Sequence, residues 1–218
     1  LFNKNKTELI KYPCKKQGTK EYSIPSSVTS ISESAFEECS SLERIEIPSS
    51  VTSIGRESFR YCSSLVSIEI PNSITKIGEW AFVGCSSLID IKIPSNITKI
   101  SRYTFWGCSN LKNIVITNSV IDIEEGAIPK NTLIYTKANT ETHRYAEEGK
   151  QGYILVGIGD LNGDGKISLV ELARISKIGT GKITNITEIE KMAIDVNEDG
   201  KINILDMAAI SKAYKAQK

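Results

Sequence analysis

Apolar residues recur every 23 positions through the first two-thirds of the chain. Ile24, Ile47, Ile70 and Ile93 each stand before a proline, and Ile116 continues this spacing with a threonine behind it. The same spacing relates a phenylalanine, a cysteine and a leucine in each copy, namely Phe36, Phe59, Phe82 and Phe105, then Cys39, Cys62, Cys85 and Cys108, then Leu42, Leu65, Leu88 and Leu111. A period of about 20 to 29 residues with regularly placed Leu and Ile is typical of leucine-rich repeats.

Each copy contains three short apolar groups, and the second copy illustrates them. The group at 42–47 alternates at its end like a half-buried strand, which Pro48 then stops. The group at 51–54 predicts a second short extended piece or a turn. The group at 59–62 has the spacing of one helical turn but is too short for a long helix. The expected unit is therefore a β-strand followed by a short helix or turn.

The copies are expected to stack, because no copy can bury its apolar face alone. Stacking gives a solenoid over residues 1–156, with ladders of Ile, Phe, Cys and Leu inside. The two ends are degenerate, as expected of caps that meet water. The N-terminal cap contains a strand at 9–12 and a basic turn at 15–18, and the C-terminal cap contains a polar helix at 139–148 and a closing strand at 153–156.

The four full copies resemble the BspA-like leucine-rich repeats of bacterial surface antigens. The motif is carried by Ile47-Pro48, Val51-Thr-Ser-Ile-Gly55, Ala81-Phe82-Val-Gly-Cys85 and Ser87-Leu88. The resemblance covers about residues 1–156. It implies a solenoid fold with a binding or adhesion role for protein or carbohydrate, and it implies no catalytic chemistry.

Two twelve-residue segments near the C-terminus have the spacing of calcium loops. Residues 160–171 fit the pattern D-x-[DN]-x-[DN]-G-x5-E, and residues 195–206 repeat it with Asp206 in place of the closing Glu. Ca²⁺ prefers six to eight oxygen ligands at these loop positions. In the first loop they are Asp160, Asn162, Asp164, the Lys166 carbonyl and the carboxylate of Glu171.

A helix is expected after each loop, since apolar residues at 169–176 and 204–214 have helical spacing. A third helix is expected between the two units, at 186–193. Only Gly157-Ile158-Gly159 precedes the first loop, which leaves no room for the entering helix of an EF-hand. So short a linker also predicts limited freedom between the two parts of the chain.

Two loop–helix units without a first entering helix resemble a type I dockerin. The resemblance covers about 158–216 and implies a small all-α domain at 157–218 with two EF-hand-like calcium loop–helix units. It implies two Ca²⁺ ions that the domain needs in order to fold, as metal sites often are coupled to folding. It adds Ser168 as a water-bridged ligand of the first ion, and for the second ion Asp195, Asn197, Asp199, the Lys201 carbonyl, Asp206 and the water-bridging Asn203.

The dockerin resemblance also implies a partner and a place of action. The partner is a cohesin module of a scaffoldin or surface-anchoring protein, in a secreted, extracellular or cell-surface cellulosome that degrades polysaccharides. Cohesin contacts are implied at Leu169, Val170, Ser176, Lys177, Ile204, Leu205, Ser211 and Lys212. The alternative for about half of the four apolar side chains is a place in the core, because helical apolar stripes are usually buried. The near-identity of the halves suggests that either half binds a cohesin, with the dockerin turned by about 180°.

Five cysteines cannot all pair with one another. Four of them share one repeat position and are expected to form a buried ladder of thiols. The fifth, Cys14, lies in the N-terminal cap, and the repeat pattern does not predict its state. The alternatives are a disulfide framework or a zinc site, although zinc sites usually use Cys pairs two to four residues apart and the chain has none.

Charge and length limit the classes of partner. A net charge of +1 favours no polyanion, so nucleic acid is not expected. No apolar run approaches the roughly 20 residues that cross a bilayer, so membrane insertion is not expected either. Four aromatic residues of the repeats are candidates for stacking on sugars or anchoring a protein, with packing between turns as the alternative. They are Tyr61, Trp80, Tyr103 and Trp106.

No catalytic motif is present, and we expect a non-catalytic protein. H-E-x-x-H, G-x-S-x-G and P-loop patterns are missing, and His143, the one histidine, is expected at the surface of a polar helix. A pair of carboxylates for glycoside hydrolysis is a spatial feature that sequence alone does not exclude. The alternative is therefore a dockerin-borne polysaccharide hydrolase with its active site on the solenoid.

Overall fold

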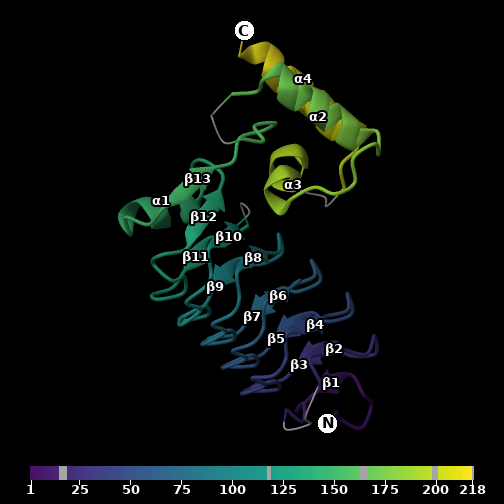
Figure 1. Ribbon diagram of the computed structural model, residues 1–218, viewed down its shortest axis with the longest axis vertical. Coiled ribbons are helices and arrows are strands. Elements are labelled where there is room, and N and C mark those ends of the chain that lie inside the picture. Colours follow the sequence, from purple (N-terminus) through teal and green to yellow (C-terminus); the bar gives the residue numbers. More distant parts are fainter. Residues whose placement is uncertain (15–18, 117–118, 163–165, 198–200, 218) are drawn as a thin grey trace.

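The computed structural model describes residues 1–14, 19–116, 119–162, 166–197 and 201–217. The chain forms a stack of turns that begins at the N-terminus, and three helices lie at the other end of the stack, where the C-terminus is found (Figure 1). Each full turn contributes two short strands, so two columns of parallel strands run along the stack.

Within each column the strands pair in parallel with those of neighbouring turns, and the pairing is interrupted once in each column, between β7 and β9 and between β6 and β8. One column contains β1 (Glu8–Leu9), β3 (Ser30–Ile31), β5 (Ser53–Ile54), β7 (Lys76–Ile77), β9 (Lys99–Ile100) and β11 (Asp122–Ile123). The other contains β2 (Glu21–Ser23), β4 (Arg44–Glu46), β6 (Ser67–Ile68), β8 (Asp90–Ile93), β10 (Asn113–Ile116), β12 (Leu133–Thr136) and β13 (Tyr153–Leu155). Ile31 lies opposite Ile54, and Ile91 lies opposite Ile114, so one repeat of the sequence is one turn.

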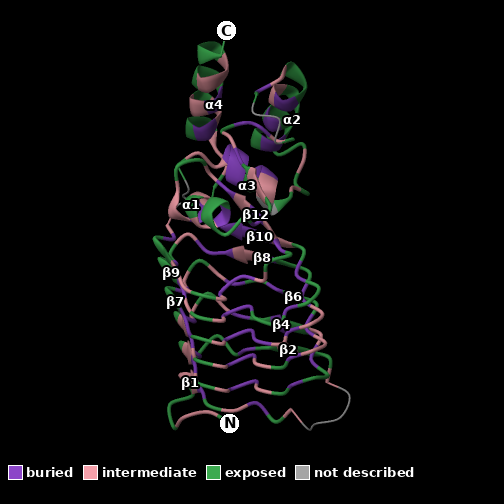
Figure 2. Cartoon of the chain, turned by 90° about the vertical axis from the view of Figure 1, so that its left-hand side faces the viewer, coloured by how far each residue is buried: buried purple, intermediate pink, exposed green. Residues whose placement is uncertain are grey.

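The interior of the solenoid consists of ladders in which one residue type is repeated from turn to turn. Buried segments recur from turn to turn along the stack (Figure 2). The rings of Phe36, Phe59, Phe82 and Phe105 are stacked, with centroids 5.1, 5.2 and 5.4 Å apart. Tyr12 extends this stack into the N-terminal cap, 5.2 Å from Phe36. Burial of these repeated apolar faces is the main driving force for stacking.

The segment between the strands is a turn in every described repeat, and the short helix considered for it does not form. Phe59 lies between Glu57 and Tyr61, whose φ angles are +54° and +58°. A left-handed residue on each side prevents a right-handed helical turn from forming. The same conformation recurs at Ser34, Glu38, Trp80, Gly84, Tyr103 and Gly107.

The caps agree in part with the expectation from sequence. The C-terminal cap contains the expected helix, α1 (Glu141–Glu148), which Thr140 caps, and the closing strand β13. At the N-terminus only β1 forms, so the strand expected over 9–12 is shorter and begins earlier. The basic turn at 15–18 lies outside the described residues.

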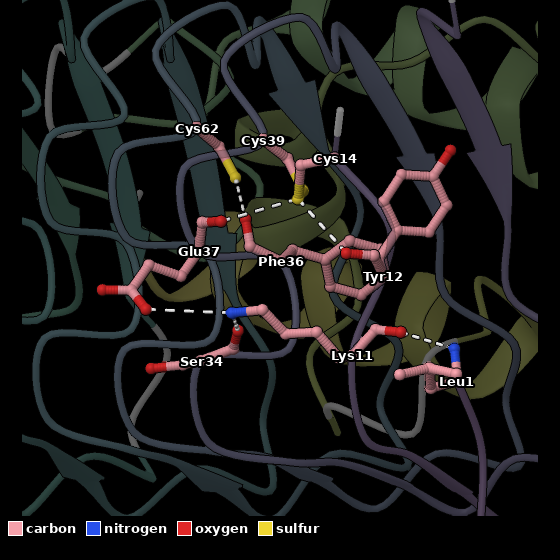
Figure 3. The surroundings of a disulfide bond; sticks show 9 residues. All are labelled: Leu1, Lys11, Tyr12, Cys14, Ser34, Phe36, Glu37, Cys39 and Cys62. Atoms are coloured by element: carbon pink, nitrogen blue, oxygen red, sulfur yellow. Dashed lines mark hydrogen bonds and ion pairs between the residues drawn. A yellow bond between two sulfur atoms is a disulfide. The ribbon is translucent and has the colours of Figure 1, made fainter. Parts of the chain in front are cut away.

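A disulfide joins Cys14 to Cys39, with Cα atoms 4.7 Å apart (Figure 3). The expectation that all four repeat cysteines form a thiol ladder is therefore wrong for Cys39. The three later cysteines each donate to the carbonyl oxygen of a phenylalanine 26 residues back, at 3.1 Å: Cys62 to Phe36, Cys85 to Phe59 and Cys108 to Phe82. Cys39 belongs to the first turn, so no earlier turn offers it a phenylalanine carbonyl. Its sulfur bonds to Cys14 of the N-terminal cap instead.

The C-terminal part contains α2 (Leu169–Gly179), α3 (Glu188–Ile194) and α4 (Ile204–Ala216), as the helical spacing predicts. These helices bury a core of their own, formed by Ile167, Ile175, Ile178, Ile194 and Ile210. A side-chain oxygen of Gln217 accepts a hydrogen bond from the amide of Ile167 at 3.0 Å and ties the end of α4 to the start of α2.

Helix α3 lies between the solenoid and the pair α2 and α4 (Figures 1 and 2). Its residues Met192 and Ala193 form a buried cluster with Val115 of β10 and Val156 after β13. In earlier turns the position of Val115 carries Glu46, Glu69 and Lys92. Val115 is the first apolar residue at this position, and Tyr135 and Ile154 follow it in register, so the column changes from polar to apolar where α3 packs on it.

Candidate calcium loops and surface sites

The two ends of each candidate calcium loop are joined by the carboxylate at its twelfth position. One Glu171 oxygen accepts from the amides of Leu161 at 2.8 Å and Asn162 at 3.3 Å, and the other accepts from Ser168 at 2.7 Å. In the second loop Asp206 accepts from Val196 and Asn203, each at 2.9 Å.

The shorter side chain of Asp206 thus makes the same two connections as Glu171, to the second and ninth residues of its loop. Both carboxylates also complete a capping box, because Ser168 and Asn203 are the N-cap residues of α2 and α4. The structure therefore gives these two expected water-bridging ligands a helix-capping contact.

Three carboxylates of the loops are buried, and their exposed fractions are 3% for Asp160, 6% for Glu171 and 1% for Asp206. Burial by itself raises the pKa of Glu171, but the hydrogen bonds from Ser168, Leu161 and Asn162 outweigh it, so its pKa lies below the ordinary value. The group is therefore held as an anion. The Glu171 oxygen that accepts from Ser168 and both oxygens of Asp206 each have a second lone pair beyond the one that the described amide occupies.

The donor set fits a hard divalent cation, because it consists of carboxylate, amide and carbonyl oxygens whose loop ends are brought together. Asp164 and Asp199 lie outside the described residues. Among the residues that are described, no group of three or more His, Cys, Asp and Glu side chains is gathered. Four expected ligands are described and exposed: Asn162, Lys166, Asn197 and Lys201.

The apolar pairs at the starts of α2 and α4 project into solvent. Exposed fractions are 70% for Leu169, 79% for Val170, 81% for Ile204 and 66% for Leu205. The alternative that about half of them are core residues is therefore wrong, because residues deeper in the helices supply the core.

Leu169 and Val170 border a shallow hollow of about 420 Å³, which Ile183 closes on one side. The polar members of the expected contact set are all exposed: Ser176, Lys177, Ser211 and Lys212.

The candidate aromatic residues mostly pack against neighbouring turns. Trp80 and Tyr103 are in ring contact at 4.9 Å, as their shared repeat position predicts. The guanidinium of Arg60 lies 4.6 Å from the ring centre of Tyr61, and Arg102 lies 5.5 Å from that of Tyr103. Trp106 is the most exposed of the four, at 54%. These contacts favour packing over ligand binding for Tyr61, Trp80 and Tyr103.

A groove of about 1300 Å³ lies between the strands β4, β6, β8 and β10 and the C-terminal helices. Its solenoid side carries exposed carboxylates, Glu46, Glu69 and Asp90, interspersed with basic side chains such as Arg44. This is a mixed, open surface, and the carboxylates lie on an exposed sheet face.

His143 is less exposed than expected, with 15% of its side chain accessible. Its Nδ1 accepts from the amide of Asn139 at 3.2 Å, and its ring meets the ring of Tyr153 edge-on at 5.0 Å. The histidine therefore fastens α1 to its neighbours in the cap.

An ion pair between α2 and α3 was not expected from the sequence. Arg174 pairs with Glu190, which also caps α3 together with Thr187. Arg174, more than the cap, holds the pKa of the Glu190 carboxyl below its usual range. The Thr-x-x-Glu pattern at 187–190 could have indicated the start of α3 and the capping role of Glu190.

Within the described residues, the longest helices remain too short and too polar to traverse a bilayer.

Family comparisons identify both parts of the chain. The model of the BspA type leucine rich repeat region matches residues 7–134 in six copies, two more than the four full copies read from the sequence. The model of the dockerin type I domain matches residues 158–213. No curated protein sequence matches the chain.

Solved structures agree with the solenoid. A leucine-rich repeat protein from Eubacterium ventriosum is 32% identical over 62% of this chain, with a TM-score of 0.58. A leucine rich cell surface protein from Faecalibacterium prausnitzii is 35% identical over 64% of this chain, with a TM-score of 0.59. This chain spans 37% of the length of each of them.

The pneumococcal vaccine antigen PcpA shares the fold, with a TM-score of 0.51 at 18% identity over 71% of this chain and 45% of its own length. Both modules of the chain are of non-catalytic kinds, typical of extracellular or cell-surface proteins. The chain belongs to the BspA-type leucine-rich repeat family and carries a type I dockerin domain behind its repeats.

Proposed function

We propose that residues 157–218 attach the chain to a cohesin module in a calcium-dependent manner, and that the solenoid at 1–156 is the non-catalytic cargo. The observation that carries this proposal is the duplicated loop closure, in which Glu171 and Asp206 make equivalent contacts to the starts of their loops. Two equivalent closures in one small domain support two equivalent ion sites.

Calcium would supply positive charge beside the buried carboxylates of each loop. Asp160, Glu171 and Asp206 are all buried, and buried carboxylates without a compensating cation oppose folding. The protein's own residues hold the loop ends together through backbone amides, which leaves oxygen lone pairs for the ion. Metal binding of this kind contributes directly to the folding free energy.

The apolar pairs at the helix starts are the proposed cohesin contacts. Leu169, Val170, Ile204 and Leu205 are exposed apolar side chains, and polar side chains surround them on the same helices. Exposed apolar anchors with a polar rim are typical of specific protein interfaces. Because both helices present such a pair, we propose that either half can engage a cohesin.

We propose that the solenoid binds a protein or carbohydrate ligand, outside the cell or at its surface. Stacked turns give extended faces of the kind that repeat proteins use for binding. The exposed Trp106 and the groove beside β4, β6 and β8 are the candidate contact areas on it.

The test uses the full chain against a panel of purified type I cohesin modules, with CaCl₂ and with EDTA. Binding that EDTA abolishes is the expected result, and binding unchanged by EDTA would contradict the calcium dependence. Loss of binding to every cohesin in the presence of calcium would contradict the attachment role. Sugar release from polysaccharides by the purified chain would favour the hydrolase alternative instead.

Variants separate the two halves. Leu169→Asp with Val170→Asp alters one half, and Ile204→Asp with Leu205→Asp alters the other, which makes each a matched control for the other. If both halves bind, each double variant keeps near-normal affinity and the quadruple variant loses roughly 30-fold or more. If one double variant alone abolishes binding, a single face is used and the two-way binding is wrong.

A further inference from the structure

Helix α3 makes contacts in two directions at once. Toward the solenoid, Met192 and Ala193 are 7% and 1% exposed and form one cluster with Val115 and Val156. Toward α2 and α4, Ile194 is fully buried in the core of the C-terminal part. A short helix with two buried faces transmits any displacement of one neighbour to the other.

The first residues of both calcium loops adjoin this contact. The second loop begins at Asp195, which is the C-cap of α3 and whose amide donates to Lys191 at 2.8 Å. The first loop begins at Asp160, directly after Gly159, whose amide donates to the carbonyl of Ala193 at 2.8 Å.

Gly159 has a φ of +72°, and a Cβ on it would lie 2.9 Å from Cγ2 of Ile210 in α4. The segment before the first loop is therefore held between α3 and α4.

The solenoid side of the contact is specialised for it. Val115 is 6% exposed, whereas Glu46 and Glu69, at the same place in earlier turns, are exposed. A valine on the open face of the column would place apolar surface in water, so its burial depends on α3. Val115 is followed in its sheet by β12 and β13, so α3 covers the outer face of the last turns and not the end of the stack.

We infer that calcium binding in the dockerin loops fastens α3 onto Val115 and Val156, so that the dockerin is a calcium-dependent cap of the solenoid. Asp160 and Asp195 are the first residues of the two loops. Asp160 directly follows the linker, and Asp195 is the C-cap of α3. Calcium that stabilises the folded loops therefore stabilises the docked position of α3 as well, by linkage. The same contact fixes one wall of the groove, where Met192, Lys191 and Ile186 face the strands.

The inference rests on the calcium binding proposed above, and two signals from the intact chain test both. The two tryptophans, Trp80 and Trp106, lie in the solenoid, so their fluorescence reports on its unfolding. The far-ultraviolet helical signal arises mainly from α2, α3 and α4. Thermal unfolding is followed by both signals in CaCl₂ and in EDTA, and calcium is expected to raise both midpoints, that of the solenoid by about 3 °C or more.

Val115→Glu tests the contact itself, because it places at this position the residue that the column carries as Glu46 and Glu69. In this variant, calcium should still raise the unfolding temperature measured by the helical signal. It should no longer raise the unfolding temperature measured by tryptophan fluorescence. Glu69→Val is the matched control, since it makes the reverse change two turns away from Val115, and it should keep both rises. Met192→Lys breaks the same contact from the other side and serves if Val115→Glu fails to fold.

The outcomes are distinguishable. If calcium raises the helical midpoint of the unaltered chain but not the tryptophan midpoint, the dockerin binds calcium and does not cap the solenoid. If both rises persist in Val115→Glu, the coupling does not pass through this contact and the inference is overturned. If calcium changes neither signal, the calcium binding itself fails, and the cap with it.

Discussion

Cys62 donates its thiol hydrogen to the carbonyl oxygen of Phe36, one turn back in the solenoid, at 3.1 Å. The same bond recurs in each of the next two turns. A thiol in this position satisfies a backbone oxygen in the interior, where no water reaches it. Burial raises the pKa of Cys62 from 9.0 to about 12, because the thiolate would lose its hydration.

This pKa predicts that the free energy of unfolding falls in alkaline solution. The folded state keeps the proton of Cys62 up to about pH 12, whereas the unfolded chain releases it near pH 9. The stabilisation is therefore complete below pH 9 and is lost as the pH rises from about 9 toward 12. Cys62 alone should contribute a slope of up to about 1.4 kcal/mol per pH unit in this window.

Urea unfolding at a series of pH values from 7 to 11 measures the slope, and Cys62→Ala provides the comparison. The substitution lowers stability at neutral pH, where the buried thiol is protonated, but it should make the alkaline decline less steep. Equal slopes for the two proteins above pH 9 would show that Cys62 does not titrate as its burial requires.

The disulfide predicts a definite number of thiols. Denatured protein without reductant should show three reactive thiols, from Cys62, Cys85 and Cys108, and five after reduction. Cys14→Ser should lower the free energy of unfolding by about 3 kcal/mol, because the closed loop of some 25 residues restricts the unfolded chain. Reduction of the unaltered chain should cost a similar amount. Five reactive thiols before reduction would contradict the pairing.

The pairing of Cys14 with Cys39 shows one limit of the sequence. The period of 23 residues predicts correctly that four cysteines share a place in the turn, and three of them do behave alike. It cannot predict how the N-terminal cap folds back, because the cap does not follow the period. The fate of Cys39 depends on that fold, since its neighbour is the cap and not another turn.

The turn around Phe59 shows a second limit. Spacing of three residues fits one helical turn, and nothing in the residue types of Glu57 or Tyr61 marks a left-handed backbone. Stacking imposes that conformation, since the amide of Phe59 donates to the carbonyl of Ala81 in the next turn at 2.8 Å. Contacts between turns thus override the local preference for a helical turn, and a prediction from spacing rests on that local preference.

The layout of the C-terminal loops was more predictable, because the loop pattern places fixed residue types at fixed spacing, and the calcium binding stays a prediction. The closure by Glu171 and Asp206 follows from that spacing. The exposure of Leu169 and Ile204 did not follow from helical periodicity, which averages over a whole helix. Both residues occupy the first turn of their helix, and the core is supplied farther along.

Ser58 offers a substitution that should stabilise the protein. Its side chain is fully buried, and among the described residues its hydroxyl has no hydrogen-bond partner. The same position carries Ala35, Ala81 and Ala127 in other turns, all fully buried. Ser58→Ala should therefore raise the free energy of unfolding by about 1 kcal/mol, since it removes an unpaired polar group.

Thr104→Ala is the control for Ser58→Ala, because Thr104 occupies the same position with a satisfied hydroxyl. Its Oγ1 donates to the carbonyl of Ser101 at 2.7 Å. This substitution should destabilise the protein by about 1 kcal/mol. Urea midpoints that move in opposite directions are expected, and a loss of stability in Ser58→Ala would contradict the unpaired state of its hydroxyl.

Gly126 and Gly181 form a matched pair of sites for testing how tightly the ring of Tyr103 is packed beside Trp80. Both have left-handed backbones, with φ of +66° and +71°. A Cβ at Gly126 would lie 2.4 Å from ring atoms of Tyr103, whereas a Cβ at Gly181 would meet nothing within 4 Å. Alanine at either site costs about 1 kcal/mol in backbone strain, and at Gly126 the displaced ring should add about 1 to 3 kcal/mol.

The difference in urea unfolding free energy between Gly126→Ala and Gly181→Ala measures this added cost. Trp80, which touches Tyr103 at 4.9 Å, should also change its emission in Gly126→Ala alone. Equal costs and unchanged emission would mean that the ring of Tyr103 moves aside freely and remains available to a ligand.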